Sequence, residues 1–276
     1  MSGGMCAGLG IAILALLAFH RMPDTQLVPT SVPTPAAAAL GFAACGLALI
    51  GIGLWFPLVT WVLAMVTLAM VISLVAERAF GVGPIVETLI AANLGVGDWS
   101  GIAPNTMAAL LLATVALFLR HSQRWFEKRL ETIAVLGSII FSIGVVASVG
   151  YMTGVPTYVW QAQSPMSFLC AIGSCVLGLG VIMSASRFSE LDEAGRPRWF
   201  IRVLFVGAVA INLFTAVAYI FGVGQTWKRA EMIGLMPMII VSGLLSGLAA
   251  WQARRQGDPA AGPLPPAASC FDARGF

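Results

Sequence analysis

Residues 103 to 120 read A-P-N-T-M-A-A-L-L-L-A-T-V-A-L-F-L-R, an apolar run that a proline opens and an arginine closes. Proline is tolerated in the first turn of a helix, because its missing N–H would have no hydrogen-bond partner there. No charged residue lies between Pro104 and Arg120, so lipid is the natural solvent for this helix. We therefore predict a membrane-spanning helix followed by a basic connection, which contains Arg120, Arg124, Lys128 and Arg129.

The composition of the whole chain agrees with that prediction. Of its 276 residues, 59% are hydrophobic and 10% are charged, whereas about a quarter of the residues of a soluble domain carry charge. The mean hydropathy is +0.91. The formal net charge of +3 is too small to indicate nucleic-acid binding. We expect an all-α polytopic membrane protein with no nucleic-acid partner.

The proline-led helix start recurs along the chain, at Pro35, Pro165 and Pro237. Between these starts, three apolar runs end on a glycine-valine pair. The pairs lie at residues 81–82, 154–155 and 222–223. A glycine after the last helical turn is a C-cap signal, because it accepts a left-handed backbone at little cost. The same signals at both ends of a repeat of roughly 60 to 70 residues favour tandem duplication of a helical hairpin.

We predict eight transmembrane helices, arranged as four tandem helical hairpins in one domain that covers residues 1–255. The hairpins are expected at about residues 5–55, 58–120, 132–183 and 200–251. All four point the same way, unlike the inverted repeats of many transporters. The tail, residues 256–276, is rich in Pro, Ala and Gly and is expected to be disordered.

Basic residues predict the orientation of these helices. If segments 120–131 and 187–202 and the C-terminal segment share one side, eleven of the fifteen Lys and Arg lie there. The positive-inside rule then places both termini, and the tail, in the cytoplasm. Tryptophans near both predicted membrane boundaries agree with this orientation, because indole rings gather at the level of the lipid headgroups.

Ionisable residues at membrane depth usually mark catalysis or transport, and no predicted span carries one near its middle. Both lysines, Lys128 and Lys228, lie in loops, so a retinal Schiff base has no anchor. The two histidines, His20 and His121, lie at opposite faces of the membrane and cannot share one haem iron. The five cysteines show no metal-binding spacing and are expected to be small buried residues. We therefore predict no catalytic residue, no metal site and no cofactor.

The remaining polar and aromatic residues gather on the predicted outer side, close to the proline-led helix starts. Trp99 and Trp160 each precede their proline by five residues, and Asn105 and Thr106 begin a helix. Asn105 and Thr106 can simply satisfy the free N–H groups of a first turn. Alternatively, the four helix starts converge on a pocket for a small apolar or aromatic ligand. The candidates for lining this pocket are Trp99, Pro104, Asn105, Thr106, Trp160, Pro165, Trp227 and Pro237.

Asn212 lies in the middle of the predicted seventh helix, at membrane depth. Its amide is expected to hydrogen-bond to a neighbouring helix and so to hold the bundle together, rather than to contact a ligand. Small residues within the helices, among them Gly41, Gly173 and Gly178, are expected to let helix backbones approach closely. We interpret these residues as determinants of packing and not as a site.

The segment A-P-N-T-M-A-A-L-L-L-A, residues 103–113, resembles a signature of bacterial membrane-bound sensor proteins. In that family a multi-helix input region precedes PAS, GGDEF or histidine-kinase modules. Residues 151–183 resemble a later copy, with a tyrosine-containing loop and a proline-led helix. The resemblance covers residues 80–183 and implies a region that senses a signal near the membrane and passes it to a cytoplasmic output. After Trp251 no kinase or cyclase module follows in this sequence.

Two functions follow from these observations. The first is a non-catalytic, sensor-like module of the bacterial inner membrane, which responds to a membrane-associated or periplasmic apolar signal. It would act through another membrane protein or as a homodimer, surrounded by membrane lipids. The second is an accessory structural subunit of a larger respiratory or photosynthetic membrane complex. A small transporter fits less well, because buried polar groups and inverted repeats are both missing from the sequence.

Overall fold

The computed structural model describes residues 34–80, 89, 102–121, 126–153, 166–187 and 199–223. These residues form six α-helices and no strand. The helices are α2 (Ala36–Gly53), α3 (Pro57–Phe80), α5 (Pro104–His121), α6 (Phe126–Thr153), α7 (Phe168–Ser186) and α8 (Phe200–Val223). The predicted helices near residues 5–19 and 237–251, and the tail, lie outside the described residues.

Four of the described helices are long and apolar enough to cross a membrane. They are α2, α3, α6 and α7, and their apolar stretches have mean hydropathies between 2.0 and 2.5. Within α5 and α8 the apolar stretches are shorter, at Pro104–Arg120 and Phe200–Ala216. The chain is thus a helical membrane protein, as its composition predicts, with six helices described where eight are expected.

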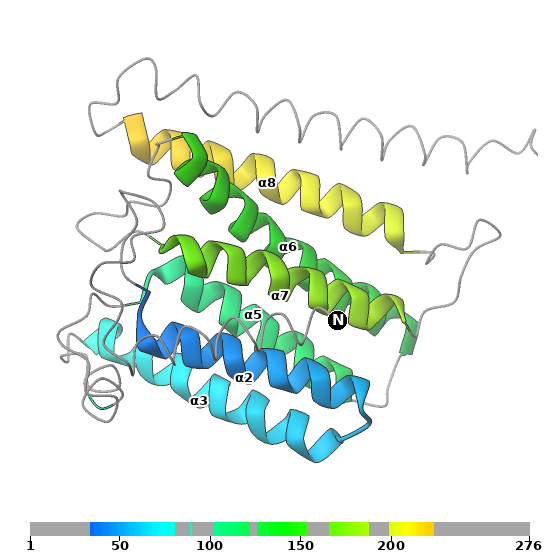
Figure 1. Cartoon of the computed structure of the whole chain (residues 1–276). Helices are drawn as coiled ribbons and strands as arrows, with labels where there is room; N and C mark the ends of the chain where they lie inside the picture. Colours follow the sequence, from blue (N-terminus) through cyan, green and yellow to red (C-terminus); the bar gives the residue numbers. More distant parts are fainter. Residues whose placement is uncertain are drawn as a thin grey trace, which may run out of the picture.

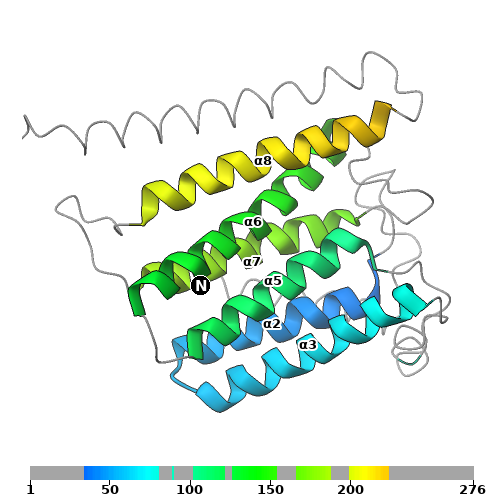
Figure 2. The same ribbon diagram turned by 180° about the vertical axis from the view of Figure 1, so that it is seen from behind.

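The six helices run side by side, and successive helices point in opposite directions (Figures 1 and 2). The pair α6–α7 makes the most extensive contact. On one side of this pair α8 packs against α6, and on the other side α2 packs against α7 and α5 packs against both α6 and α7. Helix α3 covers α2 and α5 from outside. As a result α2, α5 and α7 begin at one end of the bundle, and α3, α6 and α8 begin at the other.

Two helix boundaries correct the proline and glycine signals of the sequence. We expected a helix to begin at Pro165, but α7 begins at Phe168, because the Ser167 hydroxyl accepts a hydrogen bond from the Cys170 backbone N–H and caps the helix there. We expected Gly222 to end a helix, but α8 continues through it to Val223. A glycine inside a helix costs only about 1 kcal/mol, so an apolar run can carry the helix past it.

One further helix ends where the sequence predicts, and another is longer than predicted. Helix α3 ends at Phe80, directly before the predicted cap at residue 81. Helix α6 begins at Phe126, six residues before the predicted start, and includes the charged segment E-K-R-L-E. These residues are good helix formers, so the helix extends past its apolar run at the predicted membrane boundary.

The turn between α2 and α3 holds a tryptophan in a left-handed backbone conformation. Trp55 has a φ of 62°. The N–H of Phe56 donates to the Gly51 carbonyl at 2.9 Å, and the N–H of Trp55 donates to the Ile52 carbonyl at 3.4 Å. This pair of bonds is the Schellman pattern, in which the left-handed position usually belongs to glycine. A side chain at that position costs roughly 1 to 2 kcal/mol.

We expect Trp55→Gly to stabilise the protein in detergent by about 1 kcal/mol, because glycine removes the left-handed strain while Trp55 is 76% exposed and loses little packing. The measurement is unfolding by a denaturing detergent, followed by circular dichroism. Leu54→Gly in the same turn is the control. Leu54 has an ordinary φ of −96°, so this change should lower stability, and the two variants should differ in sign.

Helices α6 and α7 are in direct backbone contact. A Cβ atom on Gly178 would lie 2.5 Å from the Phe141 backbone nitrogen and 2.7 Å from the Gly137 carbonyl oxygen. A Cβ atom on Gly144 would lie 2.6 Å from the Cys175 backbone nitrogen. Side chains cannot be accommodated at such distances, so the close approach of these two helices requires glycine at both positions.

We expect Gly178→Ala to destabilise the bundle by about 1 to 3 kcal/mol, because the new methyl group forces two backbones apart. The matched control is Gly207→Ala in α8, where a Cβ atom would meet the Ser138 Cβ at an ordinary 3.5 Å. Unfolding in a denaturing detergent compares the two variants. Equal stability of Gly178→Ala and the unaltered protein would contradict the backbone contact.

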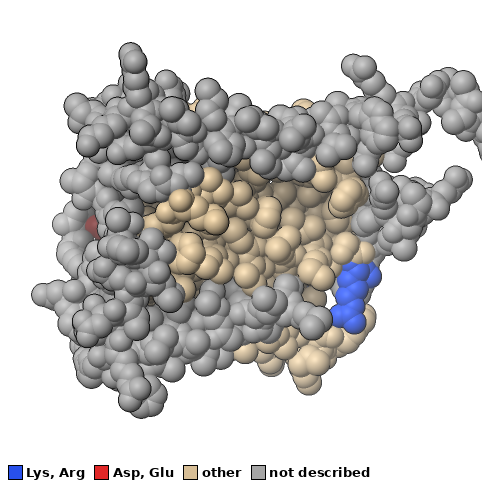
Figure 3. Space-filling model, turned by 45° about the horizontal axis from the view of Figure 1, so that its top comes forward, with Lys and Arg blue, Asp and Glu red and all other residues tan. Residues whose placement is uncertain are grey.

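Charged side chains lie at the ends of the described bundle (Figure 3). The four arginines whose side chains are described all lie at the end where α3, α6 and α8 begin, which we call the basic end. Glu131 lies there as well, whereas Glu77 lies near the opposite end, in α3. The arginines are Arg120, Arg129, Arg187 and Arg202.

Candidate functional site

The starts of α2 and α7 meet at the end opposite the basic end. The hydroxyl oxygens of Thr34 and Ser167 lie 3.0 Å apart and share a hydrogen bond, although 133 residues separate them in sequence. Both side chains are buried. Because Thr34 precedes the first turn of α2 and Ser167 caps α7, this bond joins two helix starts directly.

Helix α5 completes the same cluster. The Cys170 thiol lies beside the hydroxyl groups of Ser167 and Thr106, and the Thr106 side chain is only 1% exposed. Thr106 belongs to the first turn of α5, so three helix starts meet at one point. We call this group the hydroxyl–thiol cluster; its members are Thr34, Thr106, Ser167 and Cys170.

The structure places three of the eight predicted pocket residues near this cluster. Pro104 is the first residue of α5, as predicted, and is half-buried like Asn105. Thr106 points into the bundle. The Nδ2 atom of Asn105 is buried and has no hydrogen-bond partner in the part of the chain that the structure describes. The other five candidates, Trp99, Trp160, Pro165, Trp227 and Pro237, lie outside the described residues.

Sequence reasoning missed three members of the cluster: Thr34, Ser167 and Cys170. Serine is strongly preferred directly before a helix, because its hydroxyl oxygen accepts from the N–H of the second or third helical residue, so Ser167 at the start of an apolar run could have been found. Thr34 carries no comparable local signal, since its partner lies on a distant segment.

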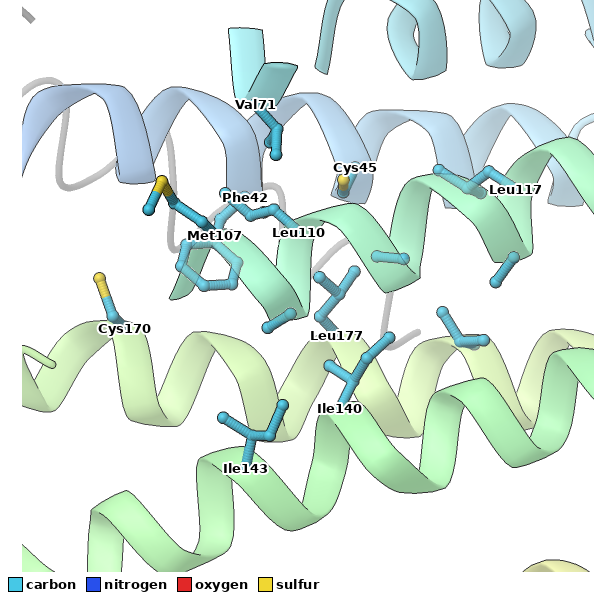
Figure 4. Close-up of a cluster of buried hydrophobic side chains, with 14 of the residues drawn as sticks. Phe42, Cys45, Val71, Met107, Leu110, Leu117, Ile140, Ile143, Cys170 and Leu177 are labelled. Atoms are coloured by element: carbon cyan, nitrogen blue, oxygen red, sulfur yellow. The ribbon is translucent and has the colours of Figure 1, made fainter. Parts of the chain in front are cut away.

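Apolar side chains fill the space below the cluster. Phe42, Met107 and Leu110 gather between α2, α5 and α7, and all three are buried (Figure 4). A Cβ atom on Gly173 would meet the Phe42 ring at 3.2 Å, and one on Gly41 would meet Leu110 at 2.7 Å. The helices are therefore closely packed directly beneath the hydroxyl–thiol cluster.

Most hydroxyl groups deeper in the bundle donate to their own helix. Thr67 donates to the Leu63 carbonyl at 2.9 Å, and Thr114 donates to the Leu110 carbonyl at 2.8 Å. The Cys45 thiol lies beside both of these hydroxyl groups, between α2, α3 and α5. Ser142 and Thr215 donate to carbonyls four residues earlier in the same way.

Asn212, which we expected to link helices, lies half-buried in α8. Its Nδ2 atom donates to the Ala208 carbonyl at 2.9 Å, within the same helix. A described bond between helices comes from Ser142, whose hydroxyl group also lies 3.1 Å from the Gly207 carbonyl of α8. The Ser142 hydroxyl is thus within hydrogen-bond distance of carbonyl groups in both α6 and α8.

Tyr151, near the end of α6, contacts the residues on both sides of Ser167 in the hydroxyl–thiol cluster. The Tyr151 hydroxyl donates to the Met166 carbonyl, directly before the cap of α7. The Tyr151 ring also meets the Phe168 ring edge-on, with centroids 5.6 Å apart. Such an arrangement favours a fixed orientation of both rings. Four helices, α2, α5, α6 and α7, therefore meet around the hydroxyl–thiol cluster.

The four members of the hydroxyl–thiol cluster are neutral hydroxyl and thiol groups, so the chemistry that they offer is hydrogen bonding. Within the described residues no group of three or more His, Cys, Asp or Glu could hold a metal ion. Hydroxyl, thiol and amide groups can hold a neutral polar atom of a ligand, such as a carbonyl oxygen. Comparison of the chain with protein-family models, with curated proteins and with solved structures finds no match.

We expect Thr34→Val and Ser167→Ala to be coupled in a double-mutant cycle, because each change removes the same hydrogen bond. Ser167→Ala should cost about 1 kcal/mol through the lost cap, and the coupling between the two changes should be about 0.6 kcal/mol, as for other hydrogen bonds between membrane helices. Unfolding in a denaturing detergent measures all four proteins.

Ser73→Ala is the control for this cycle. The Ser73 hydroxyl donates to the Ala69 carbonyl of its own helix on an exposed face of α3, so its removal should be nearly neutral and should not couple to Thr34→Val. Additive effects of Thr34→Val and Ser167→Ala would contradict a bond between these helix starts.

Proposed function

We propose that the protein is a non-catalytic membrane module that senses a small apolar ligand and acts through a partner membrane protein or a second copy of itself. One observation carries this proposal: three helix starts meet at the hydroxyl–thiol cluster, and beside them the Asn105 Nδ2 atom is buried without a partner in the described part of the chain. A ligand carbonyl could accept from this donor. A ligand bound there would affect the starts of α2, α5 and α7 at the same time.

The polar groups of the described bundle support a sensor without intrinsic catalysis. At depth these groups are hydroxyls, thiols and an amide, while described carboxylates and guanidinium groups lie toward the ends. Neutral groups of this kind can orient a ligand, and the described buried polar side chains include no carboxylate, imidazole or amine, which are the usual general acids and bases. The resemblance of residues 80–183 to sensor input regions points in the same direction.

The same proposal includes the finer architecture of eight helices in four tandem hairpins. Packing of α3 against α5 and of α6 against α7 is consistent with the second and third hairpins. The four arginines whose side chains are described lie at one end, which is consistent with the positive-inside orientation, with both termini in the cytoplasm of a bacterial inner membrane.

A second function, an accessory subunit of a larger membrane complex, is favoured by the surface of α3. This helix exposes a continuous set of large apolar side chains, including Leu58, Val62, Met65 and Ile72. Such a face can meet either lipid or a helix of another protein. In this function Asn105 would serve only packing.

The ligand proposal is tested with a short-chain ubiquinone analogue, an apolar ring that carries carbonyl acceptors. We expect it to raise the melting temperature of the detergent-solubilised protein, since a ligand at a hundredfold excess over its Kd stabilises by about 2.7 kcal/mol. Asn105→Leu should abolish the shift, because leucine keeps the volume of the side chain and removes the donor. Asn212→Leu, at a distant polar position, should keep it.

The outcomes separate the two functions. No shift in the unaltered protein, together with co-purification at fixed stoichiometry with a large assembly, would favour the accessory subunit. An equal shift in Asn105→Leu would place the ligand elsewhere and reject the proposed site.

A further inference from the structure

Arg187 lies at the basic end, at the point where α2 and α7 both end. It directly follows the last residue of α7, and its side chain is exposed. A Cβ atom on Gly53, the last residue of α2, would lie 3.9 Å from the Arg187 Nη1 atom. The C-terminal end of a helix carries a partial negative charge that favours a cation. The position of the Arg187 guanidinium group beside the end of α2 is therefore electrostatically favourable.

Arg187 and Arg202 differ in their partners, although both side chains are exposed. Arg202 donates two hydrogen bonds to the Glu131 carboxylate, at 3.0 and 3.1 Å, so its charge is neutralised within the protein. Within the described residues, the Arg187 guanidinium group forms no hydrogen bond or ion pair. Its N–H donors are thus available to an external acceptor.

Two apolar spans end at the level of Arg187. The span in α7 ends at Ser186, directly before Arg187, and the span in α2 ends at Gly53, beside the Arg187 guanidinium group. An apolar span ends where the hydrocarbon of the bilayer gives way to the lipid headgroups. The phosphate groups of the leaflet at the basic end therefore lie level with Arg187.

Large apolar side chains lie close to this position. The turn that follows Gly53 contains Leu54, Trp55 and Phe56, and each of these side chains is more than half exposed. Aromatic rings favour the membrane interface, where one part of the environment is apolar and the other is wet. The turn therefore presents an apolar surface to the headgroup region next to Arg187.

Helix α7 presents a second apolar surface on the membrane side of Arg187. Met183 and Leu179 lie four and eight residues before Arg187, and both are exposed. Residues four apart are neighbours on one face of a helix. An acyl chain can therefore lie along this face while the headgroup of the same lipid reaches the guanidinium group.

We propose that Arg187 binds the phosphate group of an anionic phospholipid from the leaflet at the basic end. The planar guanidinium group can donate two parallel hydrogen bonds to phosphate oxygens. The acyl chains of the lipid lie along the exposed face of α7, and the turn of Leu54, Trp55 and Phe56 packs beside its headgroup. An anionic lipid is favoured over a zwitterionic one, because an ammonium group in the headgroup would repel the arginine. This site is independent of the ligand proposed at the opposite end.

The test measures lipid retention by the purified protein with native mass spectrometry. Phosphatidylglycerol should be retained about fivefold more strongly than phosphatidylcholine, as expected for one arginine near an anionic membrane surface. Arg187→Gln should lose this preference. Arg202→Gln removes the same charge from the same end and should keep the preference, because Arg202 is paired with Glu131. Equal retention of both lipids by the unaltered protein, or equal loss in the two variants, would overturn the proposal.

Two further arms test the source of the phosphate and the role of the turn. Phosphatidylglycerol should raise the melting temperature, whereas inorganic phosphate at the same concentration should not, because it lacks acyl chains; an equal shift would assign the site to a free anion instead. Trp55→Gly should weaken retention of both lipids and leave their ratio unchanged, because it removes an apolar contact and no charge. Unchanged retention of both lipids in Trp55→Gly would exclude the turn from the site.

Arg187→Lys separates the charge from the geometry of the guanidinium group. Lysine keeps the charge but not the planar fork, so this variant should fold normally and keep only part of the preference for phosphatidylglycerol. A full preference would reject the paired hydrogen bonds, and no preference would reject attraction by charge.

Discussion

The direct contact between the backbones of α6 and α7 is the constraint on which the rest of the described bundle depends. Lipid chains are as apolar as the helices, so there is no hydrophobic force to hold two spans together, and close packing has to do so. Gly144 and Gly178 permit that packing, because their missing side chains leave room for the neighbouring backbone. The other helices are added to this pair on two sides.

Different interactions hold the neighbouring helices on the two sides of the α6–α7 pair. Two polar contacts hold α8 against α6. The Ser142 hydroxyl of α6 lies 3.1 Å from the Gly207 carbonyl of α8, and Glu131 of α6 forms an ion pair with Arg202 of α8 near the membrane boundary. On the side of α2 and α5, the Phe42 ring of α2 packs closely against Gly173 of α7, and Thr34 and Ser167 share a hydrogen bond. Each side therefore includes a hydrogen bond between helices, from Ser142 to Gly207 on one side and between Thr34 and Ser167 on the other.

Local signals in the sequence predict much of this fold. The start of α5 at Pro104 and the start of α2 after Pro35 follow from the restricted backbone of proline, and the end of α3 at Phe80 follows from the glycine after it. The same logic fails at Gly222, because a cap signal competes with an apolar run that prefers to stay helical. It also fails at Trp55, since nothing in a tryptophan predicts a left-handed backbone.

The candidate site is less predictable from sequence than the helices are. Thr106 was identified by its place in a first turn, but its neighbours Thr34 and Cys170 become members of one cluster only when distant helix starts meet. Among the packing glycines, Gly178 was identified from its spacing in an apolar run, whereas Gly137 and Gly144 were not. Which of many small residues faces a neighbour depends on helix rotation, and a weakly amphipathic helix in lipid gives no sequence signal for it.

The hydroxyl groups that donate to their own helix carry a consequence for biogenesis. Thr67, Thr114, Ser142 and Thr215 each reach a carbonyl one turn back, so these groups need no partner from another helix. A span of this kind can leave the translocon for the bilayer alone, before its neighbours have been synthesised. Ser142 then adds a second acceptor when α8 arrives, so insertion and assembly become separate steps.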